Sequence, residues 1–201
     1  MRLQEAKRDL YRRLARERGY RSRAAFKLME INGSYHLIHR GMYVVDLGSA
    51  PGGWLQVARK FVGGRGKVLG IDKNPVEPLP NIHTMQGDVN DPSLPEKILS
   101  TMGRKVDLIL SDLSPNIIGV WQVDHARQIS MTQNAASVAD KILVKNGNAV
   151  FKAFEGSMLN ELRDSLKTKF SKVKLYKPKA SKKASSEIYI VCLGYKGSEN
   201  I

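Results

Sequence analysis

The stretch that decides the fold reads Val44-Val45-Asp46-Leu47-Gly48-Ser49-Ala50-Pro51-Gly52-Gly53-Trp54. An apolar, β-branched run stops at an acid, a loop with three glycines follows, and residues 55–61 are typical of a helix. A strand, a glycine loop and a helix form the local plan of a nucleotide-type site, because glycine lets the backbone approach a ligand and helix N-termini offer unpaired N–H groups. The loop matches neither G-x-G-x-x-G nor the P-loop pattern. A tight turn without a ligand is the alternative, which the three glycines disfavour.

The charge of the chain is its strongest bulk property. Its 201 residues include 33 Lys and Arg against 19 acids, which gives a formal net charge of +14. Such an excess favours a polyanionic partner, most often nucleic acid. Solubility alone, or the lysine-rich composition of some thermophiles, is the alternative, but the charge is clustered. The length fits one domain with a substantial core.

Several classes of protein are disfavoured by what the sequence lacks. No apolar run approaches the roughly 20 residues of a membrane span, and the N-terminus is charged from Arg2 onward, unlike a signal peptide. A single cysteine, Cys192, excludes an internal disulfide and suits a reducing cytosol. The four histidines have no paired ligand spacing, so we expect no metal site. We therefore expect a cytoplasmic protein, without membrane attachment and monomeric.

Residues 1–32 are predicted to be a basic helical arm, and residues 33–201 the main domain. Leu3, Leu10 and Leu14 have helical spacing, Gly19 is expected to break the helix, and Ser22 is expected to cap a second helix over residues 23–31. Nine basic residues fall within 22 positions and resemble a surface for phosphates: Arg2, Lys7, Arg8, Arg12, Arg13, Arg16, Arg18, Arg21 and Arg23.

Strands and helices are predicted to alternate from Tyr43 onward. We expect strands near 43–47, 67–71, 82–86, 106–111, 147–152, 172–177 and 187–193. We expect helices near 52–61, 94–101, 121–143 and 157–169. This alternation predicts an α/β fold with a mostly parallel seven-stranded sheet and helices on both faces. The last two strands could form a hairpin, which would make an antiparallel edge.

Ionisable residues stand at the ends of successive predicted strands, where open α/β sheets bind their ligands. They are Asp46, Asp72, Asp88, Asp112 and Lys152. Any one of them could be a solvated turn residue or a helix cap, but the row together is poorly explained by caps. Asp72 lies 20 residues after Gly52, the spacing at which an acid binds a ribose diol, and Asp88 could accept from an adenine amine. These features predict a nucleoside cofactor, either NAD or S-adenosylmethionine.

Six motifs together resemble the FtsJ/RrmJ family of RNA ribose 2′-O-methyltransferases. They are D-L-G-S-A-P-G-G-W, G-I-D, G-D-V, S-D-L-S-P-N, F-K-A-F and S-S-E-I-Y, and the resemblance runs from about Arg21 to Leu193. It implies a class I, Rossmann-like, S-adenosylmethionine-dependent methyltransferase domain. It also implies an RNA substrate, specifically a uridine of large-subunit (23S) ribosomal RNA, although other branches of the family act on tRNA or mRNA caps.

The resemblance also implies the residues of the site. The implied catalytic set is Lys27, Asp112, Lys152 and Glu187. The implied cofactor contacts are Gly52, Trp54, Asp72, Asp88 and Asp112.

The residue types agree with methylation of a hydroxyl group. Lys152 is the candidate base; burial and the nearby cation Lys27 would favour its neutral amine, while Asp112 and Glu187 would oppose that shift. The sequence therefore leaves open whether Lys152 accepts the proton or orients the hydroxyl. Cys192 lies inside a predicted strand and does not suit carbon-5 methylation, and no Asn/Asp-Pro-Pro-aromatic loop follows the fourth strand.

Two basic regions flank the predicted site: the N-terminal arm, and the lysines between Lys167 and Lys183. Within the second region, residues 177–183 are expected to form a mobile loop that becomes ordered on RNA binding. Trp121 could stack on a base or pack in the core. Two other functions stay open: an RNA-binding or ribosome-assembly factor that keeps a cofactor pocket without catalysis, and a dinucleotide oxidoreductase. The intact catalytic set disfavours the first, and the missing G-x-G-x-x-G the second.

Overall fold

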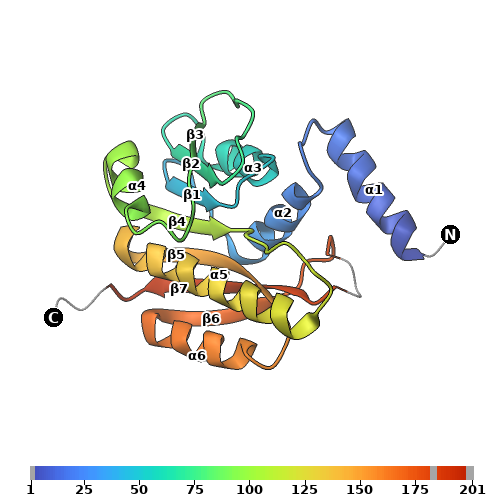
Figure 1. Ribbon diagram of the computed structural model, residues 1–201. Helices are drawn as coiled ribbons and strands as arrows, with labels where there is room; N and C mark the ends of the chain where they lie inside the picture. The colour runs from blue at the N-terminus through green and yellow to red at the C-terminus, as the bar shows by residue number, and fades with distance from the viewer. Residues whose placement is uncertain (1–2, 182–184, 198–201) are drawn as a thin grey trace.

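The computed structural model of the chain describes residues 3–181 and 185–197, which form one seven-stranded sheet covered by helices on both faces (Figure 1). The strands are β1 (Tyr43–Leu47), β2 (Lys67–Asp72), β3 (His83–Gln86), β4 (Val106–Ser111), β5 (Leu143–Phe154), β6 (Phe170–Tyr176) and β7 (Glu187–Tyr195). The helices are α1 (Leu3–Glu17), α2 (Ala24–Tyr35), α3 (Gly53–Val62), α4 (Leu94–Met102), α5 (Trp121–Ile142) and α6 (Leu159–Lys169).

The strands lie in the order β3-β2-β1-β4-β5-β7-β6. Neighbouring strands from β3 to β5 are parallel, whereas β7 pairs antiparallel with both β5 and β6. The predicted, mostly parallel sheet with antiparallel pairing at one edge is therefore confirmed. The strand order reverses between β1 and β4, and in doubly wound sheets such a switch point opens a crevice for a ligand.

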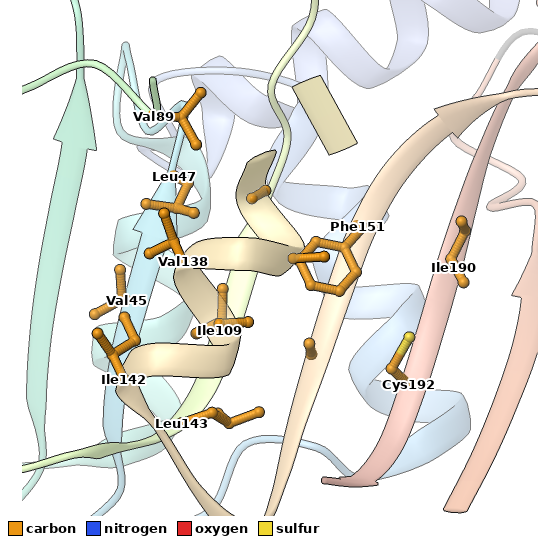
Figure 2. Close-up of a cluster of buried hydrophobic side chains, with 14 of the residues drawn as sticks. Val45, Leu47, Val89, Ile109, Val138, Ile142, Leu143, Phe151, Ile190 and Cys192 are labelled. Carbon is orange, nitrogen blue, oxygen red and sulfur yellow. The ribbon is translucent and has the colours of Figure 1, made fainter. Parts of the chain in front are cut away.

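Apolar side chains on both faces of the central strands build two cores. Val45 and Ile109 belong to the core that includes residues of α4, α5 and α6, and Figure 2 shows them beside Val138 and Ile142 of α5. Their sequence neighbours Val44 and Leu108 belong to the second core, against α2 and α3. Because successive residues of a strand point to opposite faces, a strand buried on both faces needs the unbroken apolar runs seen in the sequence.

One boundary of each of two elements differs from the prediction by four residues, whereas the other predicted boundaries agree to within two residues. β5 begins at Leu143, immediately after α5, instead of near residue 147, because Lys145-Asn146-Gly147 forms a bulge inside the strand and not a turn before it. Asn146 has a positive φ of 65° there. Helix α2 continues past Ile31 to Tyr35 and ends where His36 adopts a left-handed conformation.

The prediction that Ser22 caps the second helix is wrong. Arg23 occupies the N-cap position of α2 without a side-chain capping bond, and Ser22 contributes only its carbonyl, to the N–H of Ala25 at 3.3 Å. The Ser22 hydroxyl instead lies against Gly53, where any Cβ would be 2.3 Å from its oxygen. The Ser22 side chain, just before α2, therefore packs against the first residue of α3.

The N-terminal helices pack on the main domain. Ala15 of α1 joins Phe26 of α2 and Ala180 in a small buried cluster, with Tyr11 and Leu14 against it. Helix α2 runs across residue 32, the predicted limit of the arm, and its buried face belongs to the second core. In the part of the chain that the structure describes, no helix combines the length and apolar character that a membrane crossing requires.

Candidate active site

The glycine loop after β1 is fixed by backbone contacts at the switch point. Gly48 has a φ of +78°, donates its N–H to the carbonyl of Ile71 at 2.8 Å, and has no room for a side chain, because a Cβ would be 3.0 Å from Leu113. Gly52, with a φ of +110°, is the N-cap residue of α3. Both positions require glycine, since other residues rarely adopt a positive φ. The loop thus brings its backbone close to the ends of β2 and β4.

A cavity of about 550 Å³ opens at these strand ends. This volume lies within the range of roughly 300–1,000 Å³ that is typical of small-molecule sites. Its walls combine apolar side chains with carboxylates and loop backbone, and among the lining residues are Gly48, Ala50, Ile71, Asp72, Gly87, Val89, Asp112, Leu113, Asn116 and Met131.

The structure places only part of the predicted cofactor set on this lining. Asp72 and Asp112 line the cavity, and the Asp72 carboxylate accepts hydrogen bonds from the N–H groups of Ala50 at 2.9 Å and Asn74 at 2.8 Å. Asp88 stands between two lining residues, but its own carboxylate forms an ion pair with Lys73 at 3.0 Å. Backbone N–H bonding by Asn90, and the contact with Lys73, hold the pKa of Asp88 below its usual value in spite of the opposing effect of burial.

Gly52 and Trp54 lie beside the cavity rather than on its lining. The Trp54 indole is buried between α2 and α3 and donates its Nε1–H to the carbonyl of Ala24 at 2.8 Å. A side chain at position 52 would meet Leu79 and Arg21. A cofactor contact from these two residues would therefore involve their backbone, and their role stays a prediction.

The four predicted catalytic residues come together, from four separate segments of the chain. The Lys27 ammonium of α2 is 2.6 Å from Glu187 Oε1, and Glu187 begins β7. The Lys152 ammonium of β5 is 3.1 Å from Asp112 Oδ1 and 3.5 Å from Glu187 Oε2. Asp112 follows β4 directly and also lines the cavity. The cluster therefore adjoins the cavity through Asp112.

Strand register explains why these side chains meet. Lys152 is paired with Tyr189 across the antiparallel β5–β7 ladder, and Glu187 lies two residues from Tyr189 on the same face. Helix α2 covers that face and contributes Lys27 from its buried side. Lys27, Lys152 and Glu187 are each less than a tenth exposed, which shields the cluster from water.

Two residues that the sequence analysis did not assign to the site complete the cluster. The Tyr189 hydroxyl donates to Asp112 Oδ1 at 2.7 Å and accepts from Lys27 Nζ at 3.4 Å. The Ser181 hydroxyl donates to Glu187 Oε1 at 2.7 Å. Tyr189 could have been found, because it ends the S-S-E-I-Y motif at the same-face spacing, whereas nothing in the sequence around Ser181 indicates its contact.

The charges of the cluster balance one another. Burial lowers the pKa of Lys152, but the carboxylates of Asp112 and Glu187 raise it more, so that the pKa lies above its ordinary value. Burial raises the pKa of Glu187, but the ammonium groups of Lys27 and Lys152 bring it down to about 2. Burial, Asp112 and Glu187 all raise the pKa of the Tyr189 hydroxyl. At neutral pH, Lys152 is therefore an ammonium ion held by two carboxylates.

Asp46, which ends the first strand motif, is buried behind the cavity. Among the described residues, neither of its carboxylate oxygens has a hydrogen-bond partner. Burial, and then the negative charges of Asp112 and Asp72, raise its pKa well above the ordinary value. The Ser49 hydroxyl in the glycine loop is also buried, and no residue that the structure describes forms a hydrogen bond with it. Unpaired buried polar groups are costly, so both groups carry a free-energy cost in this part of the fold.

The fold and the site define a protein of the class I methyltransferase type, with a glycine loop after β1 and acids at the following strand ends. The model of the FtsJ-like methyltransferase family matches residues 20–195, and the chain belongs to this family. The resemblance in the six motifs is thereby confirmed.

Individual relatives agree with this assignment. The chain is 50% identical over 197 residues to Ribosomal RNA large subunit methyltransferase E of Nitrosopumilus maritimus (strain SCM1), covering 98% of this chain and 100% of that protein. A solved structure from Plasmodium falciparum, described as a ribosomal RNA methyltransferase, has a TM-score of 0.80 at 31% identity, covering 89% of this chain and 100% of the other. MycE methyltransferase from the mycinamycin biosynthetic pathway, in complex with Mg and SAH, has a TM-score of 0.56 at 16% identity, covering 88% and 49%, and shares the fold alone.

Proposed function

We propose that the protein transfers a methyl group from S-adenosylmethionine to the 2′-hydroxyl of a ribose in RNA, specifically of a uridine in large-subunit (23S) ribosomal RNA. The observation that carries the proposal is the position of Asp112, which lines the cavity and also contacts the Lys152 ammonium at 3.1 Å. A donor bound in the cavity and an acceptor beside Lys152 would thus share one residue. The names of the relatives support ribosomal RNA as the substrate.

The cavity fits the proposed cofactor in its chemistry. Carboxylates such as Asp72 suit a ribose diol, and Ile71, Val89 and Met131 offer apolar walls for an adenine ring. At Gly87 a Cβ would be 3.2 Å from both Ile71 and Leu94, so glycine keeps this wall thin. When bound, S-adenosylmethionine supplies a methyl group that is already activated on a sulfonium centre.

The residues around the acceptor would then position the hydroxyl and handle its proton. Lys152 carries a proton in the resting site, so it can accept another only after losing its own. Lys27 and Tyr189 hold Glu187 and Asp112 in place, and these two carboxylates orient Lys152. Lys152 therefore either becomes the base as its proton departs or orients the hydroxyl as an ammonium donor.

The positive charge of the chain supports an RNA partner. The net charge of +14 includes exposed arginines on α1, such as Arg12 and Arg16. Helix α1 packs on Phe26 of α2, the residue that directly precedes Lys27. Phosphate contacts there would give affinity without sequence choice. Lys182 and Lys183, part of the expected RNA-ordered loop, lie outside the described residues. A cytoplasmic location and a monomeric state stay predictions.

Labelled S-adenosylmethionine tests the proposal directly. The protein is incubated with large ribosomal subunits, with naked ribosomal RNA and, separately, with tRNA, and the modified nucleotide is located by nuclease digestion and mass spectrometry. We expect label on a ribose of the ribosomal RNA, and at least 100-fold less with the Lys152→Ala variant, because a positioned acid–base group contributes about 10²–10⁴-fold.

Three results would contradict the proposal. Label on a base, label on tRNA alone, or equal labelling by the Lys152→Ala variant would each do so. Cofactor binding without turnover on any RNA would indicate an RNA-binding or ribosome-assembly factor instead.

A further inference from the structure

Large apolar side chains are exposed together beside the candidate site. Of the exposed large hydrophobic residues that the structure describes, five lie between positions 117 and 123, in the loop after β4 and the first turn of α5, and Met158 follows β5. Trp121 is 45% exposed although its ring stacks on His125, with centroids 5.5 Å apart, and lies 6.1 Å from the Phe154 ring. We call Ile117, Ile118, Val120, Trp121 and Met158 the apolar platform. Exposed apolar groups gathered in this way mark an interaction site more often than single ones do.

Internal hydrogen bonds hold the platform in shape. Asp124 is 3% exposed, and its two carboxylate oxygens accept from the N–H groups of Ile118 and Gly119, each at 3.0 Å. His125 Nε2 accepts from the N–H of Met158 at 3.2 Å, which ties the N-cap residue of α6 to α5. The exposure of the platform is therefore fixed by the fold, because its backbone is anchored at both ends.

The platform adjoins the catalytic cluster. Phe154, on which Trp121 packs, is the β-ladder partner of Glu187. Ser114, Pro115 and Asn116, at the start of the same loop, line the cofactor cavity. In Figure 1 the beginning of α5 and helix α1 lie at the same side of the molecule, toward which β4 points. One continuous segment thus leads from the cavity, past the cluster, to the platform.

We propose that the apolar platform holds an unstacked nucleobase of the acceptor RNA, with Trp121 as the stacking ring. This inference rests on the proposed function. A ribose hydroxyl can reach the buried Lys152 only if its nucleotide, or the one next to it, leaves the RNA stack, and the exposed base then needs a new surface. Aromatic rings supply such a surface for any base.

The surrounding charge favours RNA over an apolar protein partner. Exposed Arg127 lies one turn beyond Val123 on the same face of α5, where it can meet a phosphate. Arg127 thus gives the apolar platform a cationic neighbour in a chain of net charge +14, and single-stranded nucleic acid is bound by this combination of stacking and positive charge.

Tryptophan fluorescence offers a first test that does not depend on catalysis. The chain has two tryptophans, of which Trp54 is only 3% exposed, so a base that stacks on the protein can quench Trp121 alone. The probe is a short uridine-containing single-stranded RNA, compared with the same strand carrying abasic nucleotides. We expect quenching by the first RNA and not by the second, and no quenching in the Trp121→Phe variant. Binding without quenching would overturn the proposal.

Methylation kinetics provide the second test. We expect Trp121→Ala to raise the KM for naked ribosomal RNA about 10-fold or more with little change in kcat, and Trp121→Phe to recover most of the loss. Phe61→Ala is the matched control, since Phe61 is an exposed aromatic residue on α3, which covers the opposite face of the sheet from α5. Affinity for S-adenosylhomocysteine should be unchanged in all three variants.

The outcomes separate this inference from the proposed function. An unchanged KM in Trp121→Ala, or a defect that occurs only on protein-containing ribosomal particles and so indicates a protein partner, would overturn the platform as a base site. Absence of methylation by the unmodified protein would instead refute the proposed function, and the fluorescence result would still decide whether a base stacks on Trp121.

Discussion

Burial and two neighbouring carboxylates have opposite effects on the pKa of Lys152. Burial favours loss of the proton, while Asp112 and Glu187 favour its retention, and the two carboxylates dominate. The pKa of Glu187 is about 2, so Glu187 stays ionised throughout the pH range in which an enzyme of this kind can be assayed. If Lys152 is the base, its active form appears only as the pH rises through its raised pKa, and the rate should rise with pH.

The Glu187→Gln substitution tests whether Lys152 is the base, because it removes a single negative charge beside the Lys152 ammonium. The substitution removes one of the two carboxylates that raise the pKa of Lys152, so more neutral amine is present at a given pH. We expect the rising limb of the single-turnover rate against pH to move to lower pH, by about one unit or more. The position of the limb is the readout, because altering a proposed catalytic group is also expected to change the amplitude.

Ser181→Ala is the matched control for this experiment. It removes a hydrogen bond to Glu187 and keeps the charge, so the limb should move much less. A limb that stays in place in Glu187→Gln would show that Lys152 does not titrate in the rate-limiting step and acts by orienting the hydroxyl.

At the scale of one element, the turn from β1 into α3 depends on glycine where the chain packs against Leu113, two residues after β4. The residue at position 48 must adopt a φ of +78° while facing Leu113, the neighbour of Asp112. The same turn contains Ser49 and follows Asp46, two of the buried residues whose polar side-chain atoms have no hydrogen-bond partner among the described residues. We therefore expect a substitution that strains this turn to distort the cavity more than the rest of the sheet.

We predict that Gly48→Ala weakens S-adenosylhomocysteine binding about 10-fold or more and lowers the free energy of unfolding by about 1–3 kcal/mol. The added methyl group must displace Leu113 from 3.0 Å, and the left-handed conformation itself is unfavourable for alanine. Calorimetric titration and denaturant unfolding measure the two effects. Gly64→Ala is the control, because no atom lies within 4 Å of that Cβ position and its φ is not in the left-handed region. Wild-type affinity in Gly48→Ala would contradict the assignment of this turn to the cofactor.

At the scale of the whole molecule, positive charge and packing are combined in helix α1. Tyr11, Leu14 and Ala15 cover Phe26, the neighbour of Lys27, while Arg12 and Arg16 stay exposed. Deleting the helix would therefore uncover part of the site as well as remove charge. Charge substitutions on its exposed face separate the two contributions.

The double variant Arg12→Ala/Arg16→Ala should bind ribosomal RNA more weakly and reduce the slope of log affinity against log salt by up to about 2, because each phosphate contact releases about one counterion. The melting temperature and the affinity for S-adenosylhomocysteine should not change. Lys105→Ala is the control, since Lys105 is exposed just before β4, at the amino ends of the strands. An equal loss in both variants would show that total charge, and not the arm, determines RNA affinity.

The sequence predicted the sheet well and the contacts within it less completely. Strands such as β1 and β4 are buried on both faces, so their composition reveals them, and their following acids mark one edge. The bulge at Asn146 and the role of Ser22 were missed, because both depend on which segment packs opposite. The direction of the pKa shift of Lys152 could not be predicted either, since it follows from distances between residues far apart in the sequence.

The place of β7 has a consequence for the order in which the molecule can be completed during synthesis. β7 lies between β5 and β6 although it is made after both, and it carries Glu187, the partner of Lys27 from near the beginning of the chain. A nascent chain that ends before β7 lacks the Glu187 carboxylate, which contacts the ammonium groups of Lys27 and Lys152 in the complete protein. We therefore expect the cluster of predicted catalytic residues to assemble late in biogenesis, and a partly translated chain to be inactive.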